Sequence, residues 1–137
     1  MGTVRLAKPA DYPSLREWDE FWGDRRQEMQ RAELFVYENS SSGVIGYLSL
    51  SRSAFLHYPF ISIVCVKESH RRKGIGTDLL NKVESVLEGS RHFTSTEPGN
   101  TAAKSLFKSS GFTFAGELTD VNFDRSAEQF FVKEILS

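Results

Sequence analysis

Apolar positions along the chain follow two spacings, one typical of strands and one typical of helices. Residues 58–66 (YPFISIVCV) form a run rich in β-branched and aromatic side chains, which predicts a strand buried on both faces. After Gly74 the apolar residues take the spacing of one helix face: Ile75, Leu79, Leu80, Val83, Val86 and Leu87. The segment from Cys65 to Leu87 therefore predicts a strand end, a basic turn and an amphipathic helix that closes at Gly89.

The other elements are predicted from the same two patterns and from turn and cap residues. Strands are expected at 3–7, 34–37, 44–50, 92–96, 112–118 and 128–135, and helices at 12–23, 25–31 and 101–110, with loops at 51–57 and 119–127. The order β-α-α-β-β-β-α-β-α-β-β mixes hairpins with two crossover helices. It predicts an α+β (mixed α/β) fold with three layers around a mainly antiparallel sheet. The whole chain, residues 1–137, is expected to form a single domain.

The basic turn is the first candidate for a binding site. Arg71, Arg72 and Lys73 precede Gly74 and Gly76 at the predicted start of the helix. The first N–H groups of a helix have no internal partner, and a missing Cβ lets a phosphate approach them closely. The pattern thus suits a polyanionic ligand. A tight strand-to-helix turn with a solvated basic face fits the spacing equally well.

Two familiar phosphate-binding loops are excluded by the residues themselves. The glycine pair is followed by Thr77 and Asp78, which is not G-x-x-x-x-G-K-[ST], and position 79 is leucine, which breaks G-x-G-x-x-G. The remaining pattern, R-x-x-G-x-G at 71–76, resembles the acetyl-CoA-binding motif of the GCN5-related N-acetyltransferase (GNAT) superfamily. A second segment, from Asn100 to Phe112, is similar to that family's N-x-x-A-x-x-[LF]-[YF]-x-x-x-G-F pattern, and residues 129–133 (QFFVK) resemble its last strand.

The resemblance spans roughly residues 3–135 and implies a GNAT-like three-layer α/β/α domain whose sheet is splayed between strands 4 and 5. Acetyl-CoA, the expected co-substrate, would lie in that gap. Backbone groups of Val64, Cys65 and Val66 would pair with its pantetheine arm, and Asn100 and Phe107 would flank its thiol end. The pyrophosphate would rest on the main chain from Arg71 to Thr77, which comprises Arg71, Arg72, Lys73, Gly74, Ile75, Gly76 and Thr77.

The implied reaction is acyl transfer, in which a primary amine attacks the thioester directly. Family members often place a tyrosine where this chain has Phe107, and a glutamate where it has Ser62. The remaining candidates for a general base are Glu97, His57 and Glu68, and Glu97 is preferred because it would lie beside the gap. The simpler alternative is that Glu97 is a solvated carboxylate in the turn, without a catalytic role. Cys65 is read as a small buried hydrophobe rather than as a nucleophile.

Composition narrows the classes of function. With 137 residues, 39% hydrophobic and 26% charged, the chain suits one globular domain, and a net charge of −1 argues against a general nucleic-acid binder. The single cysteine, Cys65, fits a reducing cytoplasm. No run is long enough to span a membrane, and no metal is expected. An exposed strand edge or the aromatic helix could support a homodimer.

Three functions remain open. The first is an N-acetyltransferase for a small-molecule or peptide amine, and the second is a GNAT-like acetyl-CoA or CoA sensor without turnover. A nucleic-acid binder that uses residues 70–73 is the third, and the neutral net charge disfavours it. Four acidic residues could form a mouth for a cationic amine or simply be solvated helix faces: Asp19, Glu20, Asp24 and Glu28. Among Trp18, Phe21 and Trp22, at least one ring could border a pocket.

Overall fold

The computed structural model describes residues 2–89 and 91–135. Its elements are β1 (Gly2–Leu6), α1 (Tyr12–Trp18), α2 (Arg25–Gln30), β2 (Leu34–Asn39), β3 (Gly43–Phe55), β4 (Tyr58–Val66), α3 (Ile75–Val86), β5 (Arg91–Thr96), α4 (Thr101–Ser109), β6 (Thr113–Leu118) and β7 (Glu128–Glu134). This order is the one that the sequence predicts. None of the described helices combines the length and apolar character that a membrane span requires.

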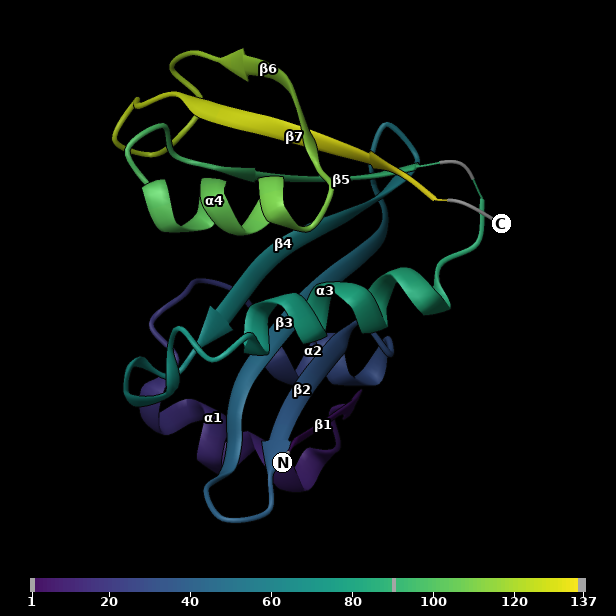
Figure 1. Ribbon diagram of the computed structural model, residues 1–137, viewed down its shortest axis with the longest axis vertical. Helices are drawn as coiled ribbons and strands as arrows, with labels where there is room; N and C mark the ends of the chain where they lie inside the picture. The colour runs from purple at the N-terminus through teal and green to yellow at the C-terminus, as the bar shows by residue number, and fades with distance from the viewer. Residues whose placement is uncertain (1, 90, 136–137) are drawn as a thin grey trace. The chain divides into compact units, whose positions relative to one another are not determined.

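The seven strands are hydrogen-bonded in the order β1-β2-β3-β4-β5-β7-β6, in a mostly antiparallel mixed α/β fold (Figure 1). Strands β4 and β5 are parallel, with Phe60 opposite Phe93 and Ile61 opposite Thr94. The predicted fold class is therefore confirmed, while the wider splay between these two strands stays a prediction.

The chain forms two compact units, Met1–Ser51 with Ser62–Val86, and Arg52–Ile61 with Leu87–Ser137. Strands β3 and β4 run through both units, because each strand crosses a boundary between these ranges. That residues 1–137 form a single domain also stays a prediction.

In the first unit, α3 packs on one face of the sheet, against β1 and β2 and close to β3. Its buried residues are Ile75, Leu79, Leu80 and Val83, as the helical spacing predicts, whereas Val86 of the same predicted face is 42% exposed. A Cβ built on Gly46 of β3 would lie 3.0 Å from Ile75 Cγ2 and 3.5 Å from Leu79 Cδ1. The missing side chain of Gly46 therefore lets the first turn of α3 lie directly on the strand.

The opposite face of the first unit carries α1 and α2. The core between these helices and the sheet contains Leu15, Leu34, Val36, Val44, Tyr47 and Cys65, with Trp18 and Met29 packed against it. Cross-strand neighbours Val36 and Tyr47 both face this core, in accordance with the β2–β3 register. Helices thus cover both faces of the sheet in this unit, which gives it three layers.

Helix α1 ends at Trp18, five residues before the predicted end at Gly23. Asp19 leaves the helical conformation with ψ 122°, and its carboxylate accepts hydrogen bonds from Tyr47 Oη (2.5 Å) and Arg25 Nε (2.9 Å). The helix stops because these long-range contacts hold Asp19 in an extended conformation. As a consequence, Phe21 and Trp22 lie after the end of the helix instead of on its apolar face, and both are exposed.

The second unit is built on β5, β6 and β7, with α4 on one face. Phe107 of α4 contacts Phe131 of β7 at a ring-centroid distance of 5.6 Å, and Asn100 Oδ1 caps the helix by accepting from Ala103 N. Ala102, which the helical pattern places in the core, is exposed.

A two-residue turn joins β3 to β4, with φ of 52° and 69° at its two residues, where the sequence predicts a seven-residue loop.

Arg25 should contribute more to stability than any surface cation, because its guanidinium is 3% exposed and pairs with Asp19 (2.9 Å) and Glu28 (2.7 Å). Replacing it with alanine leaves two partly buried carboxylates unpaired, so we expect Arg25→Ala to lower the free energy of unfolding by about 3–5 kcal/mol. The exposed pair Arg125–Asp120 provides the control, and Arg125→Ala should cost less than about 1 kcal/mol. Denaturant unfolding of both variants measures the difference. Equal losses would contradict the structural role assigned to Arg25.

Candidate functional site

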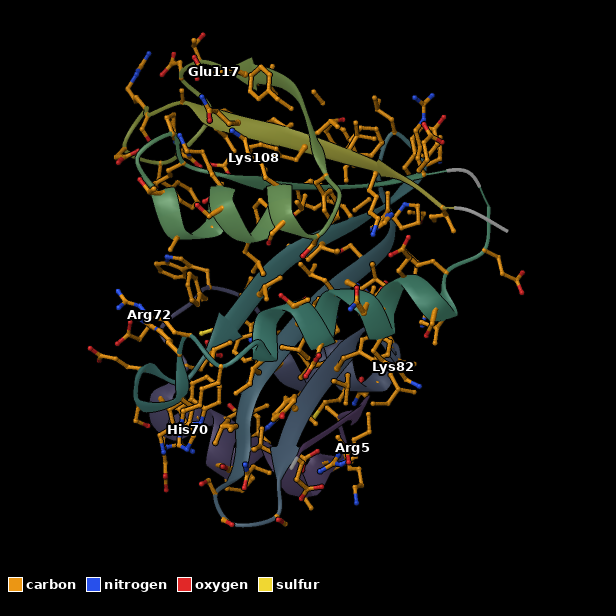
Figure 2. The ribbon with its side chains drawn as sticks, in the orientation of Figure 1. Arg5, His70, Arg72, Lys82, Lys108 and Glu117 are labelled. Atoms are coloured by element: carbon orange, nitrogen blue, oxygen red, sulfur yellow. The ribbon has the colours of Figure 1, made fainter. Side chains whose placement is uncertain are left out.

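The basic turn connects the end of β4 to the start of α3. A short 3₁₀ helix (Glu68–His70) is followed by Arg72 and Gly74, whose φ angles of 65° and 79° lie in the left-handed region. Arg71 Nε donates to the carbonyl of Val66 over 2.9 Å and so binds the turn to the end of the strand. His70 and Arg72 mark this turn in Figure 2. Glycine takes such a conformation without steric cost, which accounts for its presence at position 74.

The start of α3 presents open main-chain donors. Its first intrahelical bond is Asp78 N–H to Gly74 O (3.0 Å), so the N–H groups of residues 75–77 precede any acceptor within the helix. A Cβ at Gly74 would meet no atom within 4 Å, and the three cations before it are exposed. The helix dipole adds partial positive charge at this end. The turn therefore fits a phosphate-bearing ligand in both shape and charge.

A pocket of about 690 Å³ lies in the first unit beside the end of β4. Its lining comes from the end of α1 and the loop after it, from the end of β4, and from the basic turn. The lining residues are Glu17, Trp18, Glu20, Phe21, Cys65, Val66, Lys67, Glu68, Ser69 and Arg71. Three carboxylates face two cations in this set, so the lining is acidic. Trp18 and Phe21, two of the three rings noted in the sequence, border it.

The acidic residues noted in the sequence have separate roles. Asp19 and Glu28 bind the Arg25 guanidinium, and Asp24 caps α2 by accepting from Gln27 N over 3.2 Å. Of the four, Glu20 lines the 690 Å³ pocket. Arg25 also donates to the carbonyl of Trp22 over 2.9 Å and thereby holds the segment between α1 and α2.

Tyr47 forms part of the same buried network. Burial raises the pKa of the Tyr47 phenol well above its usual range, and its hydrogen bond to Asp19 raises it further. The phenol therefore stays a neutral donor at physiological pH. Together with Arg25, it fixes the orientation of the Asp19 carboxylate.

Cys65 lies at the pocket but belongs to the core. It is 8% exposed, and burial raises the pKa of its thiol to about 11. The thiol is therefore protonated near neutral pH and is a poor nucleophile. This agrees with its interpretation as a small buried hydrophobe.

The other predicted residues of the reaction centre lie in the second unit. Glu97 is exposed in the turn after β5, and its carbonyl accepts from Asn100 N over 3.0 Å. Phe107 is 4% exposed and packs between Phe112 and Phe131. The catalytic and binding roles of these residues remain predictions.

The two remaining positions singled out in the sequence are both exposed. His57 occupies the two-residue turn between β3 and β4. Ser62 lies on β4, with its Oγ 3.4 Å from Ser51 Oγ. Among residues 2–89 and 91–135, no group of three His, Cys, Asp or Glu side chains is arranged to hold a metal ion.

One polar cluster escaped the sequence analysis. Glu128, the first residue of β7, accepts a hydrogen bond from Ser95 Oγ (2.7 Å) and another from Asn122 Nδ2 (3.1 Å). Ser95 and Glu128 are 33 residues apart, so no local motif connects them. Only the β5–β7 pairing could have indicated that they meet.

Comparison with known protein families shows to which family the chain belongs. A sequence model described as the acetyltransferase (GNAT) family matches residues 4–112, which include the basic turn and the segment after Asn100. The chain belongs to the acetyltransferase (GNAT) family. It is therefore an acyltransferase, as the resemblance in the sequence implied.

Several solved GNAT structures have the same fold. The chain is similar to a GNAT-family acetyltransferase from Bacillus cereus ATCC 10987, with 22% identity, a TM-score of 0.87 and coverage of 100% of this chain and 99% of the other. A ribosomal-protein-alanine N-acetyltransferase from Brucella melitensis is 27% identical, with a TM-score of 0.78 and coverage of 98% and 99%. The protein yncA from Salmonella typhimurium, solved with its cofactor acetyl-CoA, is 21% identical, with a TM-score of 0.76 and coverage of 100% and 95%. No curated protein matches the chain.

The Cys65 thiol should react slowly in the folded chain. A pKa near 11 leaves roughly 100-fold less thiolate than an ordinary thiol pKa near 9, and burial restricts access further. We therefore expect Ellman's reagent at pH 8 to modify the native chain at least about 100-fold more slowly than the denatured chain. The single cysteine makes the signal unambiguous. Equal rates in the two states would show that the thiol is accessible and ionised.

Proposed function

We propose that this GNAT member is an N-acetyltransferase that moves the acetyl group of acetyl-CoA to a primary amine by direct attack on the thioester. The observation that carries the proposal is the basic turn. It joins a positively charged, open helix start to the end of β4, and an acidic pocket adjoins the same strand end. A polyanionic donor and a cationic acceptor could both be recognised by this unit.

The donor would be held mainly through the main chain. We assign the pyrophosphate to the N–H groups between Arg71 and Thr77, where the Arg71–Val66 hydrogen bond holds the turn and Gly74 leaves room. Backbone groups of Val64–Val66 would pair with the pantetheine arm. Bound acetyl-CoA supplies the activated acetyl thioester, and a main-chain N–H of the Val64–Val66 stretch would polarise its carbonyl as an oxyanion hole does. The acetyl-CoA in the yncA structure, which shares the fold, supports this assignment.

The acceptor would be a cationic amine. Glu17, Glu20 and Glu68 outnumber Lys67 and Arg71 in the pocket lining, and they would favour approach of an alkyl ammonium to the end of β4. An alkyl ammonium has a pKa of about 10.4 and a peptide α-ammonium one of about 8, so either must lose a proton before it can attack. Both peptide amines and small-molecule amines meet this description. The similarity to a ribosomal-protein-alanine N-acetyltransferase favours a peptide amine.

The leaving thiolate would depart without a tyrosine at position 107. Phe107 has no hydroxyl and is buried in the core of the second unit. A free thiol has a pKa near 8.5, so its thiolate is a tolerable leaving group near neutral pH. The single cysteine of the chain also fits action in a reducing cytoplasm.

A sensor that binds acetyl-CoA without turnover is the second candidate. It is favoured by the two departures from the family pattern, Phe107 without a hydroxyl and the exposed Ser62 in place of a carboxylate. It shares the donor site with the first candidate and differs only in the absence of acyl transfer.

Binding and turnover are separated by two measurements on the full chain. We expect calorimetry to detect acetyl-CoA binding at tens of micromolar or tighter, and a thiol-release assay with a panel of peptide and small-molecule amines to detect CoA formation that depends on the amine. Binding without amine-dependent thiol release would favour the sensor. Absence of binding in this range would overturn both candidates.

A further inference from the structure

Lys67 is a primary amine of the chain itself, placed in the wall of the 690 Å³ pocket at the end of β4. It lines this pocket together with Cys65 and Val66. Its main-chain N–H donates to the carbonyl of Ile45 over 2.8 Å, so the pairing of β4 with β3 extends to this residue. Cys65 belongs to the core under α1, and Lys67 points to the same side because side chains alternate along an extended chain. The strand thus directs the Lys67 amine toward the pocket.

Partial burial distinguishes Lys67 from the other lysines of the first unit. Lys8, Lys73 and Lys82 are exposed, whereas Lys67 is half-buried. Three carboxylates share the pocket lining with it, yet among residues 2–89 and 91–135 no carboxylate forms an ion pair with Lys67. The amine is therefore not part of a structural salt bridge, and no protein partner has to be broken before it can react.

The proposed donor site lies at the same strand end. Lys67 directly follows the Val64–Val66 stretch assigned to the pantetheine arm and the thioester, and it precedes the basic turn assigned to the pyrophosphate. Successive residues of a strand rise by about 3.3 Å, and a lysine amine sits on a flexible four-carbon stem that can reach back over this distance. The pocket lining, the strand end and the basic turn all belong to the first unit.

We propose that Lys67 is a site of self-acetylation, at which acetyl-CoA bound to the chain transfers its acetyl group to Lys67 Nζ of the same chain. The proposal rests on the proposed N-acetyltransferase function, because that function supplies the bound donor. Lys67 takes the place of the acceptor when no other amine occupies the pocket. An added acceptor amine therefore competes with it.

The step exchanges one bond at the acetyl carbon and balances without a further reactant. The Lys67 ammonium releases one proton to solvent, which frees the lone pair of Nζ. The nitrogen forms a bond to the thioester carbonyl carbon, the carbon–sulfur bond breaks, and its electron pair leaves with sulfur. The second proton lost from nitrogen neutralises the thiolate. The products are Nε-acetyl-lysine at position 67 and free CoA thiol.

Self-acetylation changes the charge of the pocket. Glu17, Glu20 and Glu68 share the lining with two cations, Lys67 and Arg71. Acetylation makes the Lys67 side chain neutral, so three carboxylates then face one cation. The modified pocket is more acidic, and the acetyl group occupies part of its volume.

Cys65 is the other nucleophile in this lining, and its acetylation would give the same mass change. The thiol is 8% exposed, and burial raises its pKa to about 11, so it is protonated near neutral pH and reacts poorly. An acetyl group on sulfur is a thioester, which hydroxylamine cleaves, whereas the amide of acetyl-lysine resists it. Hydroxylamine treatment therefore distinguishes the two products.

The test incubates the full chain with acetyl-CoA alone and follows each lysine by peptide mass spectrometry. We expect Lys67 to be acetylated at least about 10-fold faster than Lys82, an exposed lysine on α3 (Figure 2) that reacts only with donor from solution. The rate constant at Lys67 should not depend on protein concentration, because the transfer occurs within one chain. The product should resist hydroxylamine, and a peptide amine added in excess should slow its formation.

Two variants test where the acetyl group comes from and where it goes. Lys67→Arg keeps the positive charge and should remove the fast phase of acetylation from the intact mass. Gly76→Asp, which obstructs the proposed pyrophosphate site, should lower the rate at Lys67 to that at Lys82 and leave the rate at Lys82 unchanged. Equal rates at Lys67 and Lys82 in the wild-type chain, or a fast phase that persists in Lys67→Arg, would overturn the proposal.

Self-acetylation and the proposed function can fail separately. If the wild-type chain binds acetyl-CoA and releases thiol with an added amine while Lys67 stays unmodified, self-acetylation is wrong and the proposed function stands. Acetylation of Lys67 without turnover of any added amine would support the site and contradict the proposed transfer to an external acceptor. Absence of acetyl-CoA binding in calorimetry would overturn both.

Discussion

The close approach of α3 to Gly46 is the constraint on which the donor site depends. Ile75 and Leu79 pack on a strand position that has no side chain, and an added Cβ would stand only 3.0 Å from Ile75. The first turn of the helix is therefore fixed on β3 by core packing. Because Arg71 also binds the carbonyl of Val66, the basic turn is held at both of its ends. The N–H groups at the start of α3, which have no acceptor within the helix, are thus held in place and need little reorganisation to meet a phosphate.

A second constraint, the buried Arg25 guanidinium, shapes the other wall of the pocket. Arg25 binds Asp19, Glu28 and the carbonyl of Trp22, and Asp19 in turn accepts from Tyr47 in the middle of the sheet. Burial of such a network is costly unless every charge is paired, and here each is. The network ends α1 early and turns the following segment along the pocket. The acidic residues of this region therefore have different roles. Asp19 and Glu28 bind the Arg25 guanidinium, whereas Glu20 lines the pocket.

Much of the fold could be predicted because its signals are local. The apolar run of β4 and the helical spacing after Gly74 fall where the structure has them, and Asn100 caps α4 as its sequence position suggests. The end of α1 could not be predicted, since it depends on Asp19 meeting Tyr47 from 28 residues away. The β3–β4 turn was also missed, because Leu56 and His57 adopt positive φ without the glycine or asparagine that marks such turns. Glu128 escaped notice because its partner Ser95 lies 33 residues away in the sequence.

The central claim is that the pyrophosphate of acetyl-CoA rests on the first turn of α3. It is tested most directly by the calorimetric affinity of Gly76→Asp for acetyl-CoA, compared with that of Asn81→Asp, which adds the same charge to the exposed side of the same helix. An aspartate in the first turn favours the helix itself, so the fold should be retained. The account predicts a loss of at least about 100-fold in affinity for Gly76→Asp, equivalent to roughly 2.7 kcal/mol, and a change within about threefold for Asn81→Asp. Unchanged affinity in a folded Gly76→Asp variant would contradict it.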